Sequence, residues 1–457
     1  MLLKRISAAL VAAVQLCHGM VSYSGEKVVR FWVDADGLEV ERRELLSSVL
    51  NCSSCSIWTV NSKFMDVHVG NSEDLTAMDS LTSIMHEVIV EDLDSAIRGT
   101  FPVADDDLEL WETVHASGSQ QNFQVGGPDS KLQVFHALSG FFFKEFRDLR
   151  TLNIWFALLK ETFPQLVEIE EYGETPEGNK LQALHLAAHN QELNPERKTV
   201  MSLEGSMQGS RSAYLQLALS RHSCLPNYDT PTGKRETQYL NSLDFIFVPV
   251  FNPDGYNYTW TSDRLWRKNR QETYLSSCRG IDIDRSFGYE WSSSDDFPCN
   301  ENYAGEVPFE AVEARLWSEY LYHVKRDYKI YGFLDLHSYS QEILYPYAYS
   351  CESVPRDLEN LMELSFGLSK AIRAVSGKHY DVLPACKDRG SDLTPGLGSG
   401  SALDFMYHNR AHWAFQIKLR DTGNHGFLLP PKYIEPVGRE AYGAFKYFCD
   451  FILDPEN

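Results

Sequence analysis

Several residues with binding or catalytic chemistry fall near the ends of expected strands. His337 lies in Leu334-Asp-Leu-His-Ser-Tyr-Ser-Gln341, and Lys418 lies in Phe415-Gln-Ile-Lys-Leu-Arg-Asp-Thr-Gly423. Arg267 occurs in Leu-Trp-Arg-Lys, and Arg285 in Gly280-Ile-Asp-Ile-Asp-Arg-Ser-Phe287. A histidine can ligate zinc, and an arginine fork can hold a carboxylate through two hydrogen bonds. One histidine at a strand end is more often structural, so only the surrounding motif favours a ligand.

These segments, together with Asn252-Pro-Asp-Gly-Tyr256, resemble the zinc metallocarboxypeptidases of the pancreatic A/B type. The resemblance runs from about Glu26 to the C-terminus and is closest to the fungal inactive branch of the family, which is associated with cell-wall biogenesis. It implies an α/β fold with a mixed eight-stranded carboxypeptidase-type sheet and helices on both faces. A small α+β ferredoxin-like prodomain is expected to precede that sheet.

The resemblance also implies that the catalytic apparatus is lost. Active members hold zinc with a His-x-x-Glu pair and a second histidine, which His337 matches. Gln208 and Arg211 stand at the other two ligand positions, where glutamine is a weak oxygen donor and arginine cannot coordinate. Lys418 replaces the general-base glutamate, and loss of a positioned base costs about 10²- to 10⁴-fold in rate.

The charge of this pocket also opposes a metal. A divalent ion about 4 Å from Lys418 or Arg211 is repelled by roughly 8 kcal/mol at an effective dielectric constant of about 20. We therefore expect no cofactor and infer that the ancestral zinc is lost. The two cations would instead substitute for the charge of the metal and keep the pocket in shape.

Candidate substrate-binding residues are retained in part. By resemblance, Arg267 matches the arginine that polarises the scissile carbonyl, and Arg285 the one that grips a terminal carboxylate. Asp284 stands where the family has asparagine, so we expect it to compete for Arg285 and repel a ligand carboxylate. Tyr339 matches a substrate-side tyrosine, and Leu403 the side-chain specificity position. Arginines near aspartates are about as often structural pairs, and Leu403 could simply belong to the core.

Composition limits the possible partners. A net charge of −22 and a pI of about 5.1 argue against nucleic acid and anionic membranes. Lys4 and Arg5, followed by the apolar run Ile6 to Leu16, are typical of a secretory signal peptide, and no other stretch predicts a transmembrane anchor. We expect a secreted or vacuolar protein that binds a peptide, protein or cell-wall ligand.

Cysteines and sequons fit an oxidising compartment. By resemblance, Cys278 pairs with Cys299 and Cys351 with Cys386. The motif Cys52-Ser-Ser-Cys55 resembles redox and metal motifs but is more often structural, and the sequence leaves open the partners of four cysteines: Cys52, Cys55, Cys224 and Cys449. Sequons at Asn51 and Asn257 predict glycosylation.

Hydrophobic periodicity indicates the domain organisation. The predicted order for residues 28–91 is strand, helix, strand, strand, helix and strand, a split βαβ sandwich. Short apolar strands alternate with helices from about residue 134, as in sheets with helices on both faces. We expect a signal peptide at 1–24, a prodomain-like segment at 25–99, a linker at 100–133 and a carboxypeptidase-like domain at 134–457. The linker contains no dibasic processing site.

Three functions remain open. The favoured hypothesis is a pseudoenzyme that acts by binding and has a role in cell-wall organisation. The second is an active metallocarboxypeptidase whose metal ligands have moved and which removes apolar C-terminal residues. The third is a purely structural or chaperone-like protein.

Overall fold

The computed structural model describes most of the chain. The described residues are 20–33, 39–61, 63–81, 84–102, 135, 138–140, 142–187, 198–204, 231–293, 297–327, 329–388, 398–409 and 411–454. Several expectations concern residues outside these ranges: most of the signal peptide and the linker, Gln208, Arg211 and Cys224.

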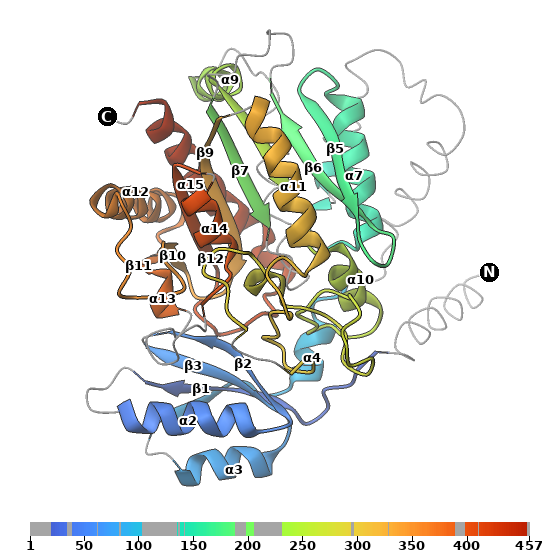
Figure 1. Ribbon diagram of the computed structural model, residues 1–457, viewed down its shortest axis with the longest axis vertical. Helices are drawn as coiled ribbons and strands as arrows, with labels where there is room; N and C mark the ends of the chain where they lie inside the picture. Colours follow the sequence, from blue (N-terminus) through green and yellow to red (C-terminus); the bar gives the residue numbers. More distant parts are fainter. Residues whose placement is uncertain are drawn as a thin grey trace, which may run out of the picture.

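The N-terminal part forms a small α+β unit. Its elements are β1 (Lys27–Trp32), α2 (Glu39–Asn51), β2 (Cys55–Val60), β3 (Phe64–Val69), α3 (Ser72–Leu81), β4 (His86–Val90) and α4 (Leu93–Arg98). The four strands form a sheet in the order β2-β3-β1-β4, with antiparallel neighbours. Helices α2 and α3 cover the outer face of this sheet, and the other face is turned toward the rest of the molecule (Figure 1). The element order agrees with the prediction, and we call this unit the N-terminal domain.

The larger part is built on an eight-stranded sheet. Its order is β11-β10-β12-β9-β7-β8-β6-β5, from the strands β5 (Val167–Glu174), β6 (Lys180–Leu186), β7 (Lys198–Glu204), β8 (Leu243–Val248), β9 (Lys329–Ser338), β10 (Glu342–Tyr345), β11 (Asp381–Pro384) and β12 (Trp413–Leu419). Pairs β7–β8, β7–β9, β9–β12 and β10–β11 are parallel, and the others are antiparallel. The predicted mixed eight-stranded sheet is confirmed, and we call this part the carboxypeptidase-like domain.

Helices pack on the sheet. They are α7 (Leu149–Thr162), α9 (Pro231–Ser242), α10 (Pro253–Thr261), α11 (Val312–Asp327), α12 (Leu358–Ser376), α13 (Ala385–Asp388), α14 (Ala402–Asn409) and α15 (Ile434–Leu453), with 3₁₀ turns η2 (Ile283–Arg285) and η3 (Pro431–Tyr433). In α7, Asp148 caps the first turn by accepting from the Thr151 amide, and the buried residues recur at helical spacing: Leu152, Trp155, Phe156 and Leu159. All six residues of β8 are buried, as expected for a central strand covered on both faces.

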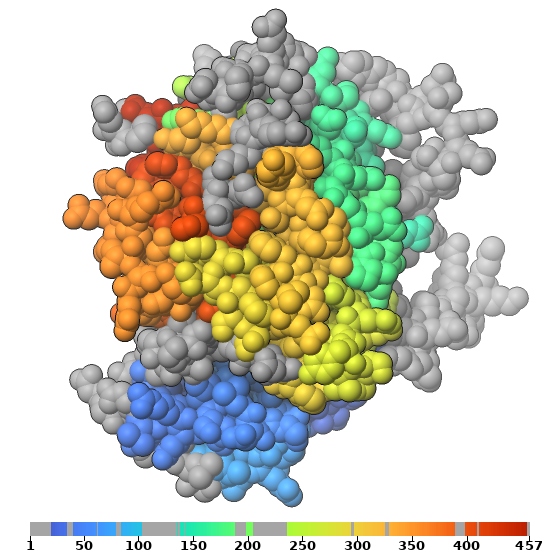
Figure 2. Space-filling model, viewed as in Figure 1, coloured from blue at the N-terminus to red at the C-terminus, as the bar shows by residue number. Residues whose placement is uncertain are grey.

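A row of polar residues crosses four strands of the large sheet at the end of the strands nearest the N-terminal domain. The strand register places Asp381, Glu342, Lys418 and His337 side by side on β11, β10, β12 and β9. Figure 2 shows the N-terminal domain lying against one end of the larger domain. The strand register and the packing of the N-terminal domain therefore bring together residues that are far apart in the sequence.

Candidate functional site

Lys418 is held by a buried carboxylate. Its ammonium group donates to Asp388 at the end of α13, with the lysine side chain 13% exposed and the aspartate side chain 0% exposed. Glu342 is the cross-strand neighbour of Lys418 and is also buried. Burial and the nearby charge of Asp388 raise the pKa of Glu342 well above its ordinary value, while Lys418 opposes this shift. The Lys418 ammonium therefore serves as a counterion within the protein.

His337 is bonded to a neighbour on its own strand. Its Nε2 lies 2.8 Å from Asp335 Oδ2, because residues two apart on β9 project to the same face. Asp335 also accepts a hydrogen bond from Gln416 Nε2 at 3.1 Å. Asp284 lies close by, and its carboxylate accepts from the Ala402 amide at 3.4 Å.

The described residues do not fit the catalytic zinc of the family resemblance. Asp284, Asp335 and His337 each offer a possible ligand atom, and these atoms lie within 4.8 Å of one another. However, His337 and Asp335 bond to each other, and Lys418, at the position where the resemblance expects the general base, offers an ammonium group already bonded to Asp388. Catalytic zinc requires an open water position beside a base. The expected replacements at Gln208 and Arg211 lie outside the described residues.

The two candidate substrate arginines share one internal partner. Arg267 Nη2 lies 2.9 Å from Asp282 Oδ2, and Arg285 Nε lies 3.2 Å from the same oxygen. Asp282 is fully buried. Asp282 thus pairs with both arginines, whereas Asp284, which the sequence predicts to compete for Arg285, accepts from the Ala402 amide. A ligand carboxylate would have to compete with Asp282 for either guanidinium.

Tyr339, the candidate substrate-side tyrosine, contacts the N-terminal domain. Its hydroxyl donates to Asp66 Oδ2 at 2.5 Å, and Tyr339 is 1% exposed. Asp66 in turn accepts two 2.7 Å hydrogen bonds from Arg30, a buried bidentate pair. Burial and Asp66 raise the pKa of Tyr339 well above its ordinary value, so the hydroxyl keeps its proton. Tyr339 thus anchors one domain to the other.

Two glycines allow this close approach. A Cβ at Gly423 would lie 1.7 Å from Arg30 Nη2, and one at Gly426 would lie 2.3 Å from the ring of Trp58. Trp58 packs on Phe427 with ring centroids 5.1 Å apart. Both glycines also have positive φ angles, so a side chain at either position would be strained as well as crowded.

Sequence comparison agrees with this fold. Residues 152–444 match the model of the zinc carboxypeptidase family. The chain belongs to that family.

Fungal relatives extend the match to nearly the whole chain. Inactive metallocarboxypeptidase ECM14 of Saccharomyces cerevisiae is 48% identical over 434 residues, covering 95% of this chain and 93% of the relative. The relative of the same name from Sclerotinia sclerotiorum is 35% identical and covers 95% of this chain and 74% of its own length. The predicted likeness to the fungal inactive branch of zinc carboxypeptidases is confirmed.

Solved structures show the same fold. Thrombin activatable fibrinolysis inhibitor superposes with a TM-score of 0.73 at 22% identity, covering 94% of this chain and 99% of that structure. Carboxypeptidase A from Helicoverpa armigera gives a TM-score of 0.72 at 21% identity, covering 94% and 98%. At these identities the likeness concerns the fold alone.

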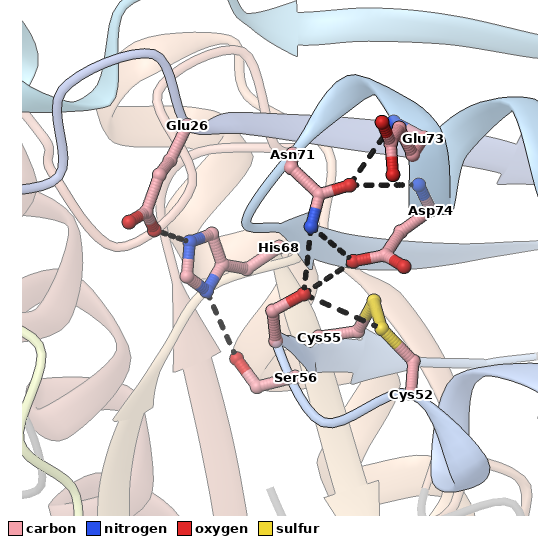
Figure 3. The surroundings of a disulfide bond; sticks show 9 residues. Glu26, Cys52, Cys55, Ser56, His68, Asn71, Glu73 and Asp74 are labelled. Carbon is pink, nitrogen blue, oxygen red and sulfur yellow. Dashed lines mark hydrogen bonds and ion pairs between the residues drawn. A yellow bond between two sulfur atoms is a disulfide. The ribbon is translucent and has the colours of Figure 1, made fainter.

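Disulfides occur in both domains of this zinc carboxypeptidase family member. The predicted pairs Cys278–Cys299 and Cys351–Cys386 are present. The structure also pairs Cys52 with Cys55, which the sequence had left unassigned, and Cys449 is a buried free thiol. Figure 3 shows the bridge beside Asn71 and Asp74, whose hydrogen bonds tie the Ser54 hydroxyl to the start of α3. This network supports a structural use of the Cys-x-x-Cys motif.

Three further candidate residues differ in their surroundings. Leu403 on α14 is 1% exposed and belongs to the main hydrophobic core. Asn51 is exposed at the end of α2, whereas Asn257 lies inside α10 and is half-buried. Thr259, which completes the second sequon, is 1% exposed. Of the two predicted glycosylation sites, Asn51 has the more accessible position.

Proposed function

We propose that this chain is a catalytically inactive carboxypeptidase-like protein that acts by binding. The observation that carries the proposal is the Lys418–Asp388 pair. By the family resemblance Lys418 stands at the general-base position, and Asp388 neutralises its positive charge. The names of the fungal relatives support the same interpretation. We expect that zinc is absent from the working molecule.

The N-terminal domain is proposed to remain part of that molecule. The Arg30–Asp66–Tyr339 contact is buried, and breaking it would leave a charge without its partner. An inert enzyme also needs no activating cleavage. Recovery from the native source of only a fragment beginning near residue 130 would contradict this part of the proposal.

The proposed ligand is a peptide, a protein or a cell-wall component, encountered in the secretory pathway, outside the cell or in the vacuole. Three disulfides support an oxidising compartment. Every helix in the described part of the chain is too short or too polar to cross a membrane. A role in cell-wall organisation is proposed from the family resemblance.

A peptide-library binding screen tests the binding role. If the pocket binds C-terminal carboxylates, Asp282→Asn should strengthen capture because it frees Arg267 and Arg285 from their internal partner. Arg285→Ala in the same background should abolish the gain, with Arg315→Ala, an exposed side chain on α11, as the matched control. Unchanged capture in all three variants would place the binding surface elsewhere on the protein.

A further inference from the structure

The turn between β2 and β3 contacts the polar row of the large sheet, which is formed by Asp381, Glu342, Lys418 and His337. Asn61 Nδ2 donates to Glu342 Oε1 at 3.0 Å, and these residues are 2% and 4% exposed. Asn61 Oδ1 accepts from the Lys63 and Phe64 amides, so the turn itself fixes the direction of the Asn61 amide. The N-terminal domain therefore covers Glu342 with a rigid donor.

Charges converge on Glu342 from several elements. Asp388 on α13 and Lys418 on β12 form an ion pair beside it. On β11, Asp381 is paired with Lys63 of the N-terminal domain and lies 3.1 Å from His379. Lys418 thus faces two carboxylates, Asp388 and Glu342, and it already bonds Asp388. An ionised Glu342 would add a second negative charge in a site that is closed to water.

We propose that the contact between Asn61 and Glu342 is a proton-dependent latch, in which the N-terminal domain docks on neutral Glu342 and loosens when Glu342 ionises. This inference goes beyond the proposed binding role, since it concerns how firmly the two domains are joined. It requires no metal and no particular ligand.

The direction follows from proton linkage. Docking removes water from Glu342, and desolvation is the largest cause of its raised pKa, followed by the charge of Asp388. The docked form therefore holds the proton more tightly than an undocked form would. The stabilisation that protonated Glu342 gives to docking is complete at acidic pH and is lost as the pH rises through the pKa of docked Glu342. Asp388 lies in the same domain as Glu342 and raises its pKa in the docked and the undocked form alike. Asn61 can donate to either form of Glu342, so Asn61 fixes the geometry, while the burial that docking adds supplies the pH dependence.

Two isosteric substitutions separate this latch from a plain contact. Glu342→Gln keeps an oxygen acceptor for Asn61 and removes the titration. Asn61→Asp keeps the acceptor for the Lys63 and Phe64 amides but turns a carboxyl group toward Glu342 Oε1. Asn71→Asp is the matched control, because Asn71 also faces a carboxylate, that of Asp74, but in an exposed site beside the Cys52–Cys55 bridge (Figure 3).

The experiment is hydrogen–deuterium exchange on the intact chain between pH 5.5 and 8.5, expressed as protection relative to the intrinsic exchange rate. Local opening of the contact governs protection in residues 61–66 and 341–345. We expect protection in the wild type to fall with rising pH, by at most about tenfold per pH unit for one linked proton. Glu342→Gln should show no such fall. Asn61→Asp should lower protection at neutral pH and regain it in acid, whereas Asn71→Asp should match the wild type in residues 341–345.

Two results would overturn the latch. One is the same pH slope in Glu342→Gln as in the wild type, and the other is equal behaviour of Asn61→Asp and Asn71→Asp. If Glu342→Gln folds poorly, the wild-type slope and the Asn61→Asp comparison still decide the matter. Either failure leaves the pseudoenzyme proposal untouched, since that proposal depends on metal content and hydrolysis.

Discussion

The pocket has a Lys418 side and an arginine side, which carries Arg267 and Arg285. On both sides the positive charges are paired with buried aspartates, but the two sides differ in whether the residue type matches the family. By the family resemblance Lys418 replaces the general-base glutamate, and its positive charge is neutralised by buried Asp388. Arg267 and Arg285 keep the residue type that the same resemblance expects, yet both bond to buried Asp282. The difference teaches that a retained residue type does not establish a retained role, because the internal partner decides what the side chain can still bind.

Tyr339 extends the comparison to the N-terminal domain. It also keeps the family's residue type, but its hydroxyl is used to hold Asp66. The retained residues of this pocket are therefore engaged within the chain, either by the same domain or by its neighbour.

Reversing the charge at Lys418 should have the largest effect. Lys418→Glu would place a third carboxylate beside Asp388 and Glu342, and breaking a buried ion pair costs about 3–5 kcal/mol. We expect a loss of that size in chemical denaturation and no gain of carboxypeptidase activity. Lys378→Glu, at an exposed position, is the control and should change stability by less than about 0.5 kcal/mol.

Restoring the ligands is the complementary test on this side. Because water activation requires a bound metal first, only the combination Gln208→His, Arg211→Glu and Lys418→Glu is expected to regain zinc binding, with His337 as the third ligand. Turnover should stay poor, since Asp284 lies near the arginines and Asp282 occupies them. Zinc-dependent hydrolysis by Lys418→Glu alone would refute the assignment of the missing ligands.

The next prediction concerns how the unfolding free energy depends on pH through Glu313, which Asn269 links to the arginine side of the pocket. Burial raises the pKa of Glu313 to about 7, although Asn269 donates to its Oε2 at 2.7 Å. Asn269 also accepts from the Ile281 amide and so links Glu313 to the Asp282 segment. A raised pKa in the folded state contributes stability at acidic pH that is lost as the pH rises through about 7.

The expected loss is about 3 kcal/mol of unfolding free energy between pH 4.5 and pH 8.5, because folding raises the pKa of Glu313 from 4.5 to about 7. Glu313→Gln should remove this part of the pH dependence when urea denaturation is followed at several pH values. Glu319→Gln, on the same helix but exposed, should retain it. Parallel curves for the wild type and Glu313→Gln would show that this carboxyl does not titrate in the expected range.

The Tyr339 anchor should have an intermediate effect. Tyr339→Phe removes one hydrogen bond to a charged acceptor, which is worth about 1.5–3 kcal/mol. We expect lower hydrogen-exchange protection around Asp66 at every pH, without a change in the pH slope. Tyr331→Phe is the control, because the Tyr331 ring stacks on His412 near the start of β9, whereas Tyr339 follows the end of that strand. Unaltered protection around Asp66 would show that Tyr339 does not hold the domains together.

The exposed ion pair at the same interface should matter least. Lys63 and Asp381 side chains are 53% and 33% exposed, and exposed pairs contribute about 0–1 kcal/mol. A double-mutant cycle of Lys63→Ala and Asp381→Ala should give a coupling in that range that decreases with added salt. A larger, salt-independent coupling would mean that this pair, and not the buried Asn61–Glu342 contact, contributes most to the domain contact here.

Much of the fold was predictable because its signals are local. The apolar run of β8 and the alternation in the N-terminal domain identified strands, and most motif residues fell at strand ends. Helix boundaries are harder to predict from the sequence: α15 begins at Ile434, although Pro436 and Gly438, residue types that usually mark turns, lie near its start.

The pairing within the pocket was not predictable. Asp388 and Asp66 are separated from Lys418 and Tyr339 by 30 and 273 residues, and no sequence pattern joins them. Asp282 lies two residues from Asp284, and only the three-dimensional path through η2 shows that Asp282 reaches both arginines. Glu342 could have been suspected as a charged residue in a short apolar strand, but its contact with Asn61 depends on how the domains dock.

Metal content measured together with hydrolysis tests the central claim most directly. The full-length protein would be purified without chelators, equilibrated with zinc, analysed for bound metal and assayed on peptides with apolar C-terminal residues. We predict zinc far below one equivalent per chain and no zinc-dependent release of the terminal residue. Stoichiometric zinc that is lost in His337→Ala or Asp335→Asn, accompanied by hydrolysis, would show that a displaced metal site is active and would contradict the account.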